Sequence, residues 1–302
     1  MPITINRKRE IYDESGKAYE IGDCLYNVFN QGNIYSIKGC NDKVYVESSD
    51  IFANRYEVRN MSNLSKYTPY FERMFWPEML TQDQKGFICQ KPMIQGQFIT
   101  MAEIIENRKT KKKLTLEEKH YYLSVGIQLA GIIDTVHKCS YVVGALSPEK
   151  IFVSSEGKVY SFLSYQFAFN NINAFDTMYY IAPEWFDKMN KNRIVYDEKS
   201  DAFLYALVLF QLLTGVFPFA SDRDVSQVDK EELWGLMSDG KSVYFWEDET
   251  TISVIEEELS DQPPKIKELF RRAFDYCGQD NYVENRPSVN EWIRSLQDND
   301  GI

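Results

Sequence analysis

The residue types that most often carry chemistry are sparse in this sequence. It has two histidines, His120 and His137, and five cysteines, none of which stands in a Cys-x-x-Cys pair. Zinc sites and disulfide frameworks need paired or closely spaced cysteines, so neither is predicted and no metal site is expected. No Ser-His-Asp or Cys-His arrangement can be assembled around either histidine. The usual residues for nucleophilic or metal-dependent catalysis are therefore missing.

Charged residues gather in two short stretches. A basic run covers Arg108–Lys113, and acidic residues cluster at Glu247–Glu249 and Glu256–Glu258. We interpret the basic run as a solvated loop before a helix, with a recruitment patch as the alternative. The acidic residues are interpreted as solvated surface, with docking of a basic partner as the alternative. The net charge of −11 disfavours nucleic acids and anionic membranes as partners, because both need a positive surface.

Short strands are predicted in the first third of the chain. β-branched and aromatic residues recur between Gly, Asn and Asp in Gly32–Gly39, Lys43–Glu47 and Gly86–Gln90. Pro92–Gln97 reads as a linker. This part of the chain, residues 1–93, is predicted to be a small β-rich unit.

Helical periodicity replaces the strand pattern from Thr115 onward. Thr115 and Glu118 form a possible capping box. The apolar residues behind it recur every three or four positions, which predicts one buried helical face: Tyr122, Val125, Leu129, Ile132, Ile133 and Val136. Further helices are predicted at Ala202–Leu213, ended by Gly215 and Pro218, and near Lys265–Tyr276 and Val289–Gln297. Residues 94–302 are therefore predicted to form a larger, mainly helical unit.

Three motifs in the second half of the chain resemble the C-lobe of a protein kinase. Thr177–Glu184 resembles the end of an activation segment, with its Ala-Pro-Glu triplet. Asp201 stands where that family begins its buried central helix, and Arg286 where a late arginine pairs with the triplet's glutamate. The resemblance runs from about Tyr19 to Leu296. It implies an α+β, bilobal protein kinase-like fold, with an N-lobe over 1–93 and a C-lobe over 94–302.

Two other segments are similar to a bacterial branch of eukaryotic-like Ser/Thr kinases. Val142–Val153 resembles its Gly-Asp catalytic loop, and Trp76–Leu80 with the residues after it resembles its N-lobe. Some members of that branch are associated with phosphatase and von Willebrand A-domain partners. The resemblance thus implies a protein partner, with a kinase, a phosphatase or a von Willebrand A-domain protein as candidates.

The N-lobe positions that would hold nucleotide phosphates are degraded. Phosphoryl transfer needs a lysine on the phosphates, and the matching strand position is Val46. Of the three glycines in the expected Gly-x-Gly-x-x-Gly loop, only Gly32 is present, and it lies one residue later than the motif requires. An ordinary hairpin is therefore the simpler interpretation. Lys43 is a candidate phosphate ligand. It is only a minor one, because strand alternation puts its side chain on the face opposite that of Val46. Glu57 is one candidate for the partner glutamate of that lysine.

The C-lobe positions that would perform the chemistry are also changed. Ala145 replaces the proton-accepting aspartate, and Lys150, interpreted as a surface lysine, replaces the magnesium-binding asparagine. Ser147 lies between them. Leu163 falls where the second magnesium acid belongs. No Asp or Glu occurs anywhere between Glu156 and Asp176, so this absence does not depend on the alignment.

The positions that hold such a lobe together are retained. The resemblance implies that Glu184 pairs with Arg286, that Asp201 ties the catalytic-loop backbone, and that His137 is structural. Removing one partner of a buried ion pair costs roughly 3–5 kcal/mol, which favours a structural role for Glu184 and Arg286.

The sequence therefore predicts a catalytically inactive pseudokinase that acts as a protein-interaction or regulatory module, with no cofactor. The alternatives are an atypical nucleotide-binding protein, or a phosphotransferase that uses relocated residues such as Lys43 or Lys150. An odd number of cysteines without a Cys-x-x-Cys pair fits a reducing compartment. The sequence also has no signal-peptide pattern, and its longest apolar run, Ala202–Phe210, is shorter than the about 20 residues of a membrane span. Together these features predict a cytoplasmic protein. The uncharged stretch Phe167–Phe175 is predicted to pack onto the C-lobe or to present a docking face.

Overall fold

The computed structural model shows an α+β protein with a six-stranded sheet in the first part of the chain and mostly helices, with a small three-stranded sheet, in the rest. It describes residues 9–28, 32–47, 71–92, 97–111, 113–140, 142–144, 146–161, 179–186, 196–220, 228–242, 256–257, 259–260, 262–274 and 282–297. The contacts divide the chain into two compact units. The first is Met1–Met93 with Ser161–Phe169, and the second is Ile94–Tyr160 with Asn170–Ile302.

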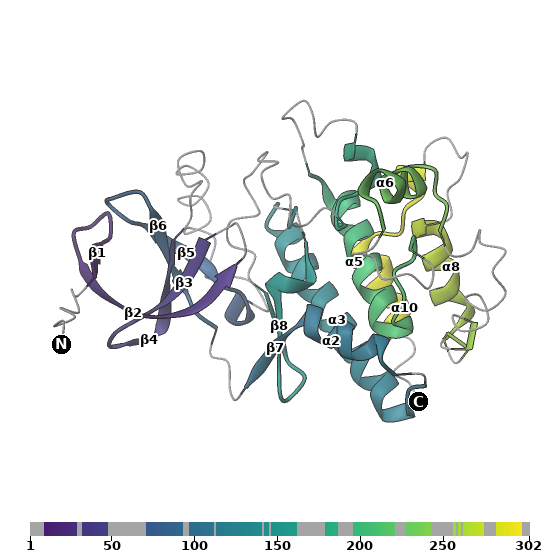
Figure 1. Cartoon of the computed structure of the whole chain (residues 1–302), viewed down its shortest axis with the longest axis horizontal. Helices are drawn as coiled ribbons and strands as arrows, with labels where there is room; N and C mark the ends of the chain where they lie inside the picture. The colour runs from purple at the N-terminus through teal and green to yellow at the C-terminus, as the bar shows by residue number, and fades with distance from the viewer. Residues whose placement is uncertain are drawn as a thin grey trace. The chain divides into compact units, whose positions relative to one another are not determined.

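The first unit is built on a six-stranded antiparallel sheet with the order β1-β2-β3-β4-β6-β5 (Figure 1). The strands are β1 (Glu10–Tyr12), β2 (Ala18–Val28), β3 (Gly32–Ile37), β4 (Cys40–Glu47), β5 (Trp76–Leu80) and β6 (Gly86–Gln90). A short 3-10 turn, η2 (Phe71–Arg73), precedes β5. The three predicted strands are confirmed, although the first ends at Ile37 and the second begins at Cys40, three residues early.

The sheet curls so that its two edge strands meet at one end. Asp13, just after β1, bridges Thr81, just after β5. The N–H of Gln82 bonds the carbonyl of Tyr12 at 2.8 Å, and the N–H of Glu14 bonds the carbonyl of Leu80 at 3.1 Å. The residues that this curl encloses form a buried apolar cluster: Ile11, Tyr19, Ile21, Ile37, Tyr45 and Ile88.

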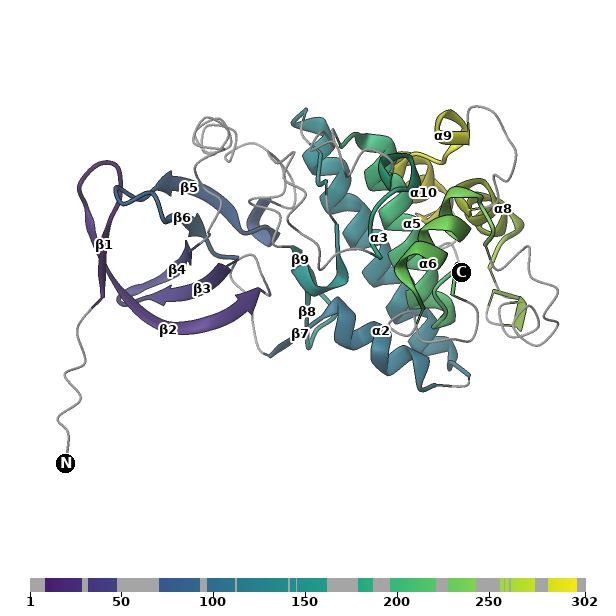
Figure 2. The same ribbon diagram turned by 45° about the horizontal axis from the view of Figure 1, so that its top comes forward.

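The second unit is mainly helical, with a three-stranded sheet of order β7-β8-β9. The strands are β7 (Phe98–Thr100), β8 (Ile151–Ser154) and β9 (Val159–Ser161), and the helices are α2 (Met101–Lys109), α3 (Leu116–Lys138), α5 (Glu198–Thr214), α6 (Lys230–Ser238), α8 (Pro264–Phe274), α9 (Tyr282–Asn285) and α10 (Val289–Gln297). Two short 3-10 turns are η3 (Pro148–Lys150) and η5 (Pro183–Trp185). Figure 2 shows α3 and α5 lying side by side, with α10 packed against both.

The predicted capping box starts α3. The Thr115 hydroxyl accepts the N–H of Glu118, and the Glu118 carboxylate accepts the N–H of Thr115. All six apolar residues predicted for its inner face are buried. They pack toward α5, which is buried along nearly its whole length and ends at Gly215, whose φ of 76° only glycine adopts without strain.

One helix start differs from the sequence-based expectation, and one helix was not predicted. α5 begins at Glu198, before the predicted start, because the Asp197 side chain caps the N–H of Ser200. α2 was not predicted, although Thr100 and Glu103 form the same capping box as the one before α3. The predicted helix near Lys265–Tyr276 is α8, whose last two expected residues lie outside the described part.

The interpretation of Arg108–Lys113 as a solvated loop is wrong for its first residue. Arg108 belongs to α2 and is buried. Its guanidinium donates to the carbonyl of Lys111 at 2.9 Å and to that of Leu213 at 3.0 Å. Arg108 therefore satisfies a carbonyl in the last turn of α5, where the helix itself provides no donor.

Candidate functional site

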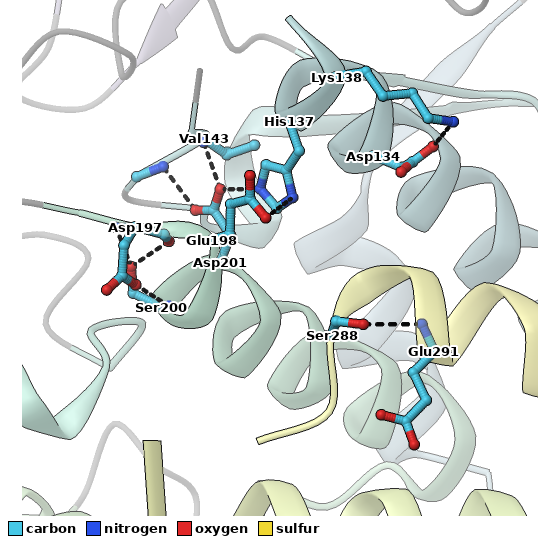
Figure 3. Close-up of polar contacts among 11 residues, drawn as sticks. Asp134, His137, Lys138, Val143, Asp197, Glu198, Ser200, Asp201, Ser288 and Glu291 are labelled. Atoms are coloured by element: carbon cyan, nitrogen blue, oxygen red, sulfur yellow. Dashed lines mark hydrogen bonds and ion pairs between the residues drawn. The ribbon is translucent and has the colours of Figure 1, made fainter. Parts of the chain in front are cut away.

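The best-defined polar cluster in the second unit surrounds Asp201, a carboxylate with 0% exposure in the first turns of α5. Its Oδ2 lies 2.8 Å from Nε2 of His137, in the last turn of α3. The same oxygen accepts the N–H of Val143 at 2.6 Å, and Oδ1 accepts the N–H of Gly144 at 2.8 Å (Figure 3). One carboxylate therefore joins α3, α5 and the segment that follows α3.

Two opposing effects act on this carboxyl group. Burial raises the pKa of Asp201, while the His137 imidazole and the N–H groups of Val143 and Gly144 lower it, and burial prevails. Both oxygens are engaged by the protein, and neither is exposed. Asp201 consequently serves as a structural anchor for this segment.

The segment held by Asp201 is shaped by a glycine. Gly144 has a φ of 78°, in the left-handed region, and its carbonyl accepts the N–H of Leu146 at 2.9 Å. Between them stands Ala145, the residue at the expected proton-acceptor position, which lies outside the described residues. Ser147 follows and is buried, and its hydroxyl has no hydrogen-bond partner among the described residues.

Lys150 is not the surface lysine that the sequence suggested. It ends η3, and its residue is only 3% exposed. η3 packs against α2 and β7, and it leads directly into β8, whose four residues are all buried. The chain has therefore already entered the core at Lys150. A buried ammonium at this position would repel a divalent cation.

Glu184 and Arg286 form the ion pair that the resemblance implied. The two guanidinium nitrogens of Arg286 donate to the two carboxylate oxygens of Glu184 at 2.9 and 3.0 Å. Arg286 also donates to the carbonyl of Lys199 at 2.8 Å and lies over the ring of Phe203, 4.8 Å from its centroid. This pair connects the segment before α5 with the segment before α10.

Two predicted positions lie in β4 of the first unit. Val46 is 1% exposed and pairs with Phe87 of β6. Lys43 lies three residues earlier and forms an ion pair with Glu78 of β5. The Lys43 ammonium thus contacts a carboxylate of the same sheet, which disfavours a role as a phosphate ligand.

The structure supports the hairpin interpretation at Gly32. β2 and β3 pair antiparallel up to Val28 and Gly32, which lie opposite each other. The side chains of Tyr26 and Val28 are not described. Other predicted positions also lie outside the described residues: Glu57, Leu163, the stretch Phe167–Phe175 and the acidic stretch Glu247–Glu249.

The basic run is largely neutralised by neighbouring carboxylates. Lys109 pairs with Glu106, Lys111 with Glu118, and Lys113 with Glu257 of the second acidic stretch. A recruitment patch needs uncompensated positive charge, so these pairs disfavour that alternative.

Sequence reasoning missed a second polar contact in the core of the second unit. The Tyr180 hydroxyl and the Gln211 amide, from α5, lie 3.1–3.2 Å apart. Burial raises the pKa of Tyr180 beyond its ordinary value. Tyr180 lies in the motif Thr177–Glu184, but its contact with Gln211 could not be predicted, because the two residues are thirty-one positions apart in the chain.

These contacts form a polar framework within the α+β fold. In the described ranges, no group of three or more His, Cys, Asp or Glu side chains could hold a metal ion. No helix within those ranges is both long enough and apolar enough to cross a membrane. No protein-family model matches the chain, and no curated protein matches it significantly.

Proposed function

We propose that this chain is a pseudokinase: a bilobal, protein kinase-like scaffold that lacks phosphotransferase activity and acts as a protein-interaction or regulatory module. In this proposal the first unit corresponds to the N-lobe and the second to the C-lobe. The chain would need neither a nucleotide nor a metal ion to perform its role.

The observation that carries the proposal is that Asp201 holds the loop backbone, while the residue at the proton-acceptor position of that loop is an alanine. Asp201 holds the backbone of Val143 and Gly144 through short hydrogen bonds, as an anchor of a catalytic loop would. The next residue is Ala145, whose methyl group cannot accept a proton. A loop that is held in place but has no proton acceptor at this position supports a protein that has kept the kinase-like fold and lost phosphoryl transfer.

The electrostatics of the other predicted positions support the same proposal. Transfer of a phosphoryl group needs cations and magnesium-binding carboxylates around the phosphates. Here Val46 is apolar, Lys43 is paired with Glu78, and Lys150 is a cation where a magnesium ligand would be needed. No carboxylate occurs in residues 157–175 to provide the second ligand.

The surface charge supports a protein partner in place of a nucleic acid or a membrane. The net charge is −11 and much of the basic run is paired to carboxylates, so the described residues offer no evident positive surface for a polyanion. We propose a cytoplasmic module whose partner is a protein such as a kinase, a phosphatase or a von Willebrand A-domain protein.

A phosphotransfer assay tests the proposal. The full chain is incubated with γ-labelled ATP and either Mg²⁺ or Mn²⁺, alone and with a generic protein substrate, and label incorporation is measured. We expect no incorporation above background. Incorporation of label by the unaltered chain that is lost in Lys43→Ala or Lys150→Ala would overturn the proposal. It would favour a phosphotransferase that uses relocated residues.

A further inference from the structure

Three side chains of β3 and β4 form an aromatic and acidic cluster on one face of the first sheet. Tyr35 lies directly opposite Tyr45 in the register of the two strands, and their rings stack with centroids 6.0 Å apart. Glu47 follows Tyr45 by two residues, so its side chain points to the same face. The Tyr35 hydroxyl donates to Oε2 of Glu47 at 3.1 Å, which holds the carboxylate beside the rings.

A cation of the same chain binds to this cluster. Arg9, the residue before β1, places its guanidinium carbon 4.9 Å from the centroid of the Tyr35 ring and 5.7 Å from that of the Tyr45 ring. Its Nη2 donates to Oε1 of Glu47. Two aromatic rings and a carboxylate therefore surround one guanidinium, and this combination of groups is suited to recognising arginine.

The contacts that hold the Arg9 side chain are weak enough to be exchanged. This side chain is 43% exposed. Ion pairs and cation–π contacts between partly exposed side chains each contribute little to stability. The backbone of Arg9 is held separately, because its carbonyl accepts the N–H of Ile21 at 2.8 Å. The guanidinium can therefore rotate away from the cluster while β1 stays in place.

The cluster also has a hydrogen-bond donor that Arg9 cannot satisfy. Tyr45 is 0% exposed, and its hydroxyl has no hydrogen-bond partner among the described residues. Burial raises the pKa of Tyr45, the Asp83 and Glu47 carboxylates raise it further, and the Arg9 guanidinium opposes them, so the hydroxyl lies within the influence of the bound cation. A guanidinium has no acceptor for this hydroxyl, whereas a peptide brings backbone carbonyls together with its side chain.

We propose that Tyr35, Tyr45 and Glu47 form a binding site for an arginine side chain of a protein partner, and that Arg9 is an internal occupant that blocks this site. The partner's guanidinium would replace that of Arg9 on the two rings and on Glu47, and a neighbouring carbonyl would accept the Tyr45 hydroxyl. A basic segment complements the net charge of −11. The inference does not rest on the loss of phosphoryl transfer, so its test and the label-incorporation assay can fail independently.

Titration of the full chain with a short blocked peptide, acetyl-Gly-Arg-Gly-amide, tests the site, with binding followed by NMR shifts of the β3 and β4 amides. We expect Arg9→Ala to bind the peptide about tenfold more tightly than the unaltered chain, because a blocked site lowers the apparent affinity in proportion to its free fraction. Arg9→Gln, which changes the packing less, should show the same gain. Lys17→Ala is the matched control, since Lys17 lies over another ring, 5.0 Å from the centroid of Tyr19, and it should bind as the unaltered chain does. Equal affinities of the Arg9 variants and the unaltered chain, or no binding to any of them, would overturn the proposal.

Three comparisons in the Arg9→Ala chain test what the site recognises. Glu47→Gln should weaken binding of the arginine peptide about tenfold, because the guanidinium loses its charged acceptor. A peptide with citrulline, which has nearly the shape of arginine but no charge, should not bind. A lysine peptide should bind several-fold more weakly, because an ammonium lacks the planar face that stacks on the rings. Affinity that is unchanged by Glu47→Gln or by citrulline would overturn the cation site, and a lysine peptide of equal affinity would overturn its assignment to arginine.

Discussion

Asp201 determines the position of three chain segments through one buried carboxylate. Its two oxygens receive a contact from His137 and the N–H groups of Val143 and Gly144. Such an arrangement is stable only while every donor has its acceptor, because a buried donor without a partner loses the hydrogen bonds that water gave it.

Removing this carboxylate should be strongly destabilising. We expect Asp201→Ala to lower the free energy of unfolding by about 3–5 kcal/mol, because a buried charged partner and the acceptor of two buried N–H groups disappear together. Glu198→Gln is the matched control, since Glu198 is exposed and lies 4.0 Å from the same histidine. Urea denaturation measures both, and equal midpoints for the two variants would contradict the anchoring role.

Arg108 and Lys109 are adjacent residues with different roles. Arg108 is buried and donates to two carbonyls, whereas Lys109 makes a surface ion pair with Glu106. We expect Arg108→Met to destabilise the chain by about 1–3 kcal/mol, because a buried carbonyl loses its donor. Lys109→Met should change stability by no more than about 1 kcal/mol. Thermal denaturation of the two variants would reveal the difference, and a larger effect for Lys109 would refute it.

At the scale of elements, capping residues mark both ends of helices: Gly215 predicted the end of α5, and a capping box stands at the start of α3. The Thr-x-x-Glu pattern predicted the start of α3, and the same pattern at Thr100 would have revealed α2. The apolar periodicity behind Thr115 predicted which residues of α3 are buried, since one face of an amphipathic helix must pack against the core. Strand existence was predictable from composition, but strand order was not, because hydrogen bonding between β4 and β6 joins residues about forty positions apart.

The closure of the first sheet should respond to acid. Burial favours a raised pKa for Asp13, but hydrogen bonds from Ser15, Lys17 and Tyr19 outweigh it and lower the pKa below its usual value. Burial and the Asp13 carboxylate in turn raise the pKa of Tyr19 to about 12. A lowered carboxyl pKa stabilises the fold above the ordinary value of about 4, and this contribution is lost as the pH falls through the folded-state value.

The measurement compares the unaltered chain with Asp13→Asn by urea denaturation from pH 6 to pH 3. We expect the unaltered chain to be more stable at pH 6 and its advantage to shrink as the pH falls below about 4. An advantage that is constant over this range would show that the charge of Asp13 does not stabilise the closure.

Two glycines of different elements should respond oppositely to alanine. A Cβ on Gly86 in β6 would lie 2.2 Å from the carbonyl oxygen of Val46, so strand β4 would have to move. A Cβ on Gly235 in α6 would meet nothing within 4 Å. We expect Gly86→Ala to cost about 1–3 kcal/mol and Gly235→Ala to stabilise by about 0.5–1 kcal/mol. Denaturation midpoints that shift in the same direction would contradict this account of the packing.

At the scale of the whole molecule, the change from a β-rich to a mainly helical part of the chain followed from the change in hydrophobic period, but the small sheet of β7, β8 and β9 within the helical part was not predicted. The framework contacts of the candidate site required more than periodicity. The pairing of Glu184 with Arg286 spans about a hundred positions and was inferred only from the order of motifs. The burial of Lys150 could not be inferred, because a lysine after a proline turn has no local signal for entering the core.

The central claim is that the scaffold lacks the electrostatics to hold a magnesium-bound triphosphate. Calorimetric titration of the full chain with ATP, once with excess Mg²⁺ and once with a chelator, tests it most directly, together with thermal denaturation in the same solutions. A ligand at about 100 times its Kd would stabilise the folded chain by about 2.7 kcal/mol. We predict no binding heat and no thermal shift in either solution, and saturable micromolar binding of MgATP would contradict the account.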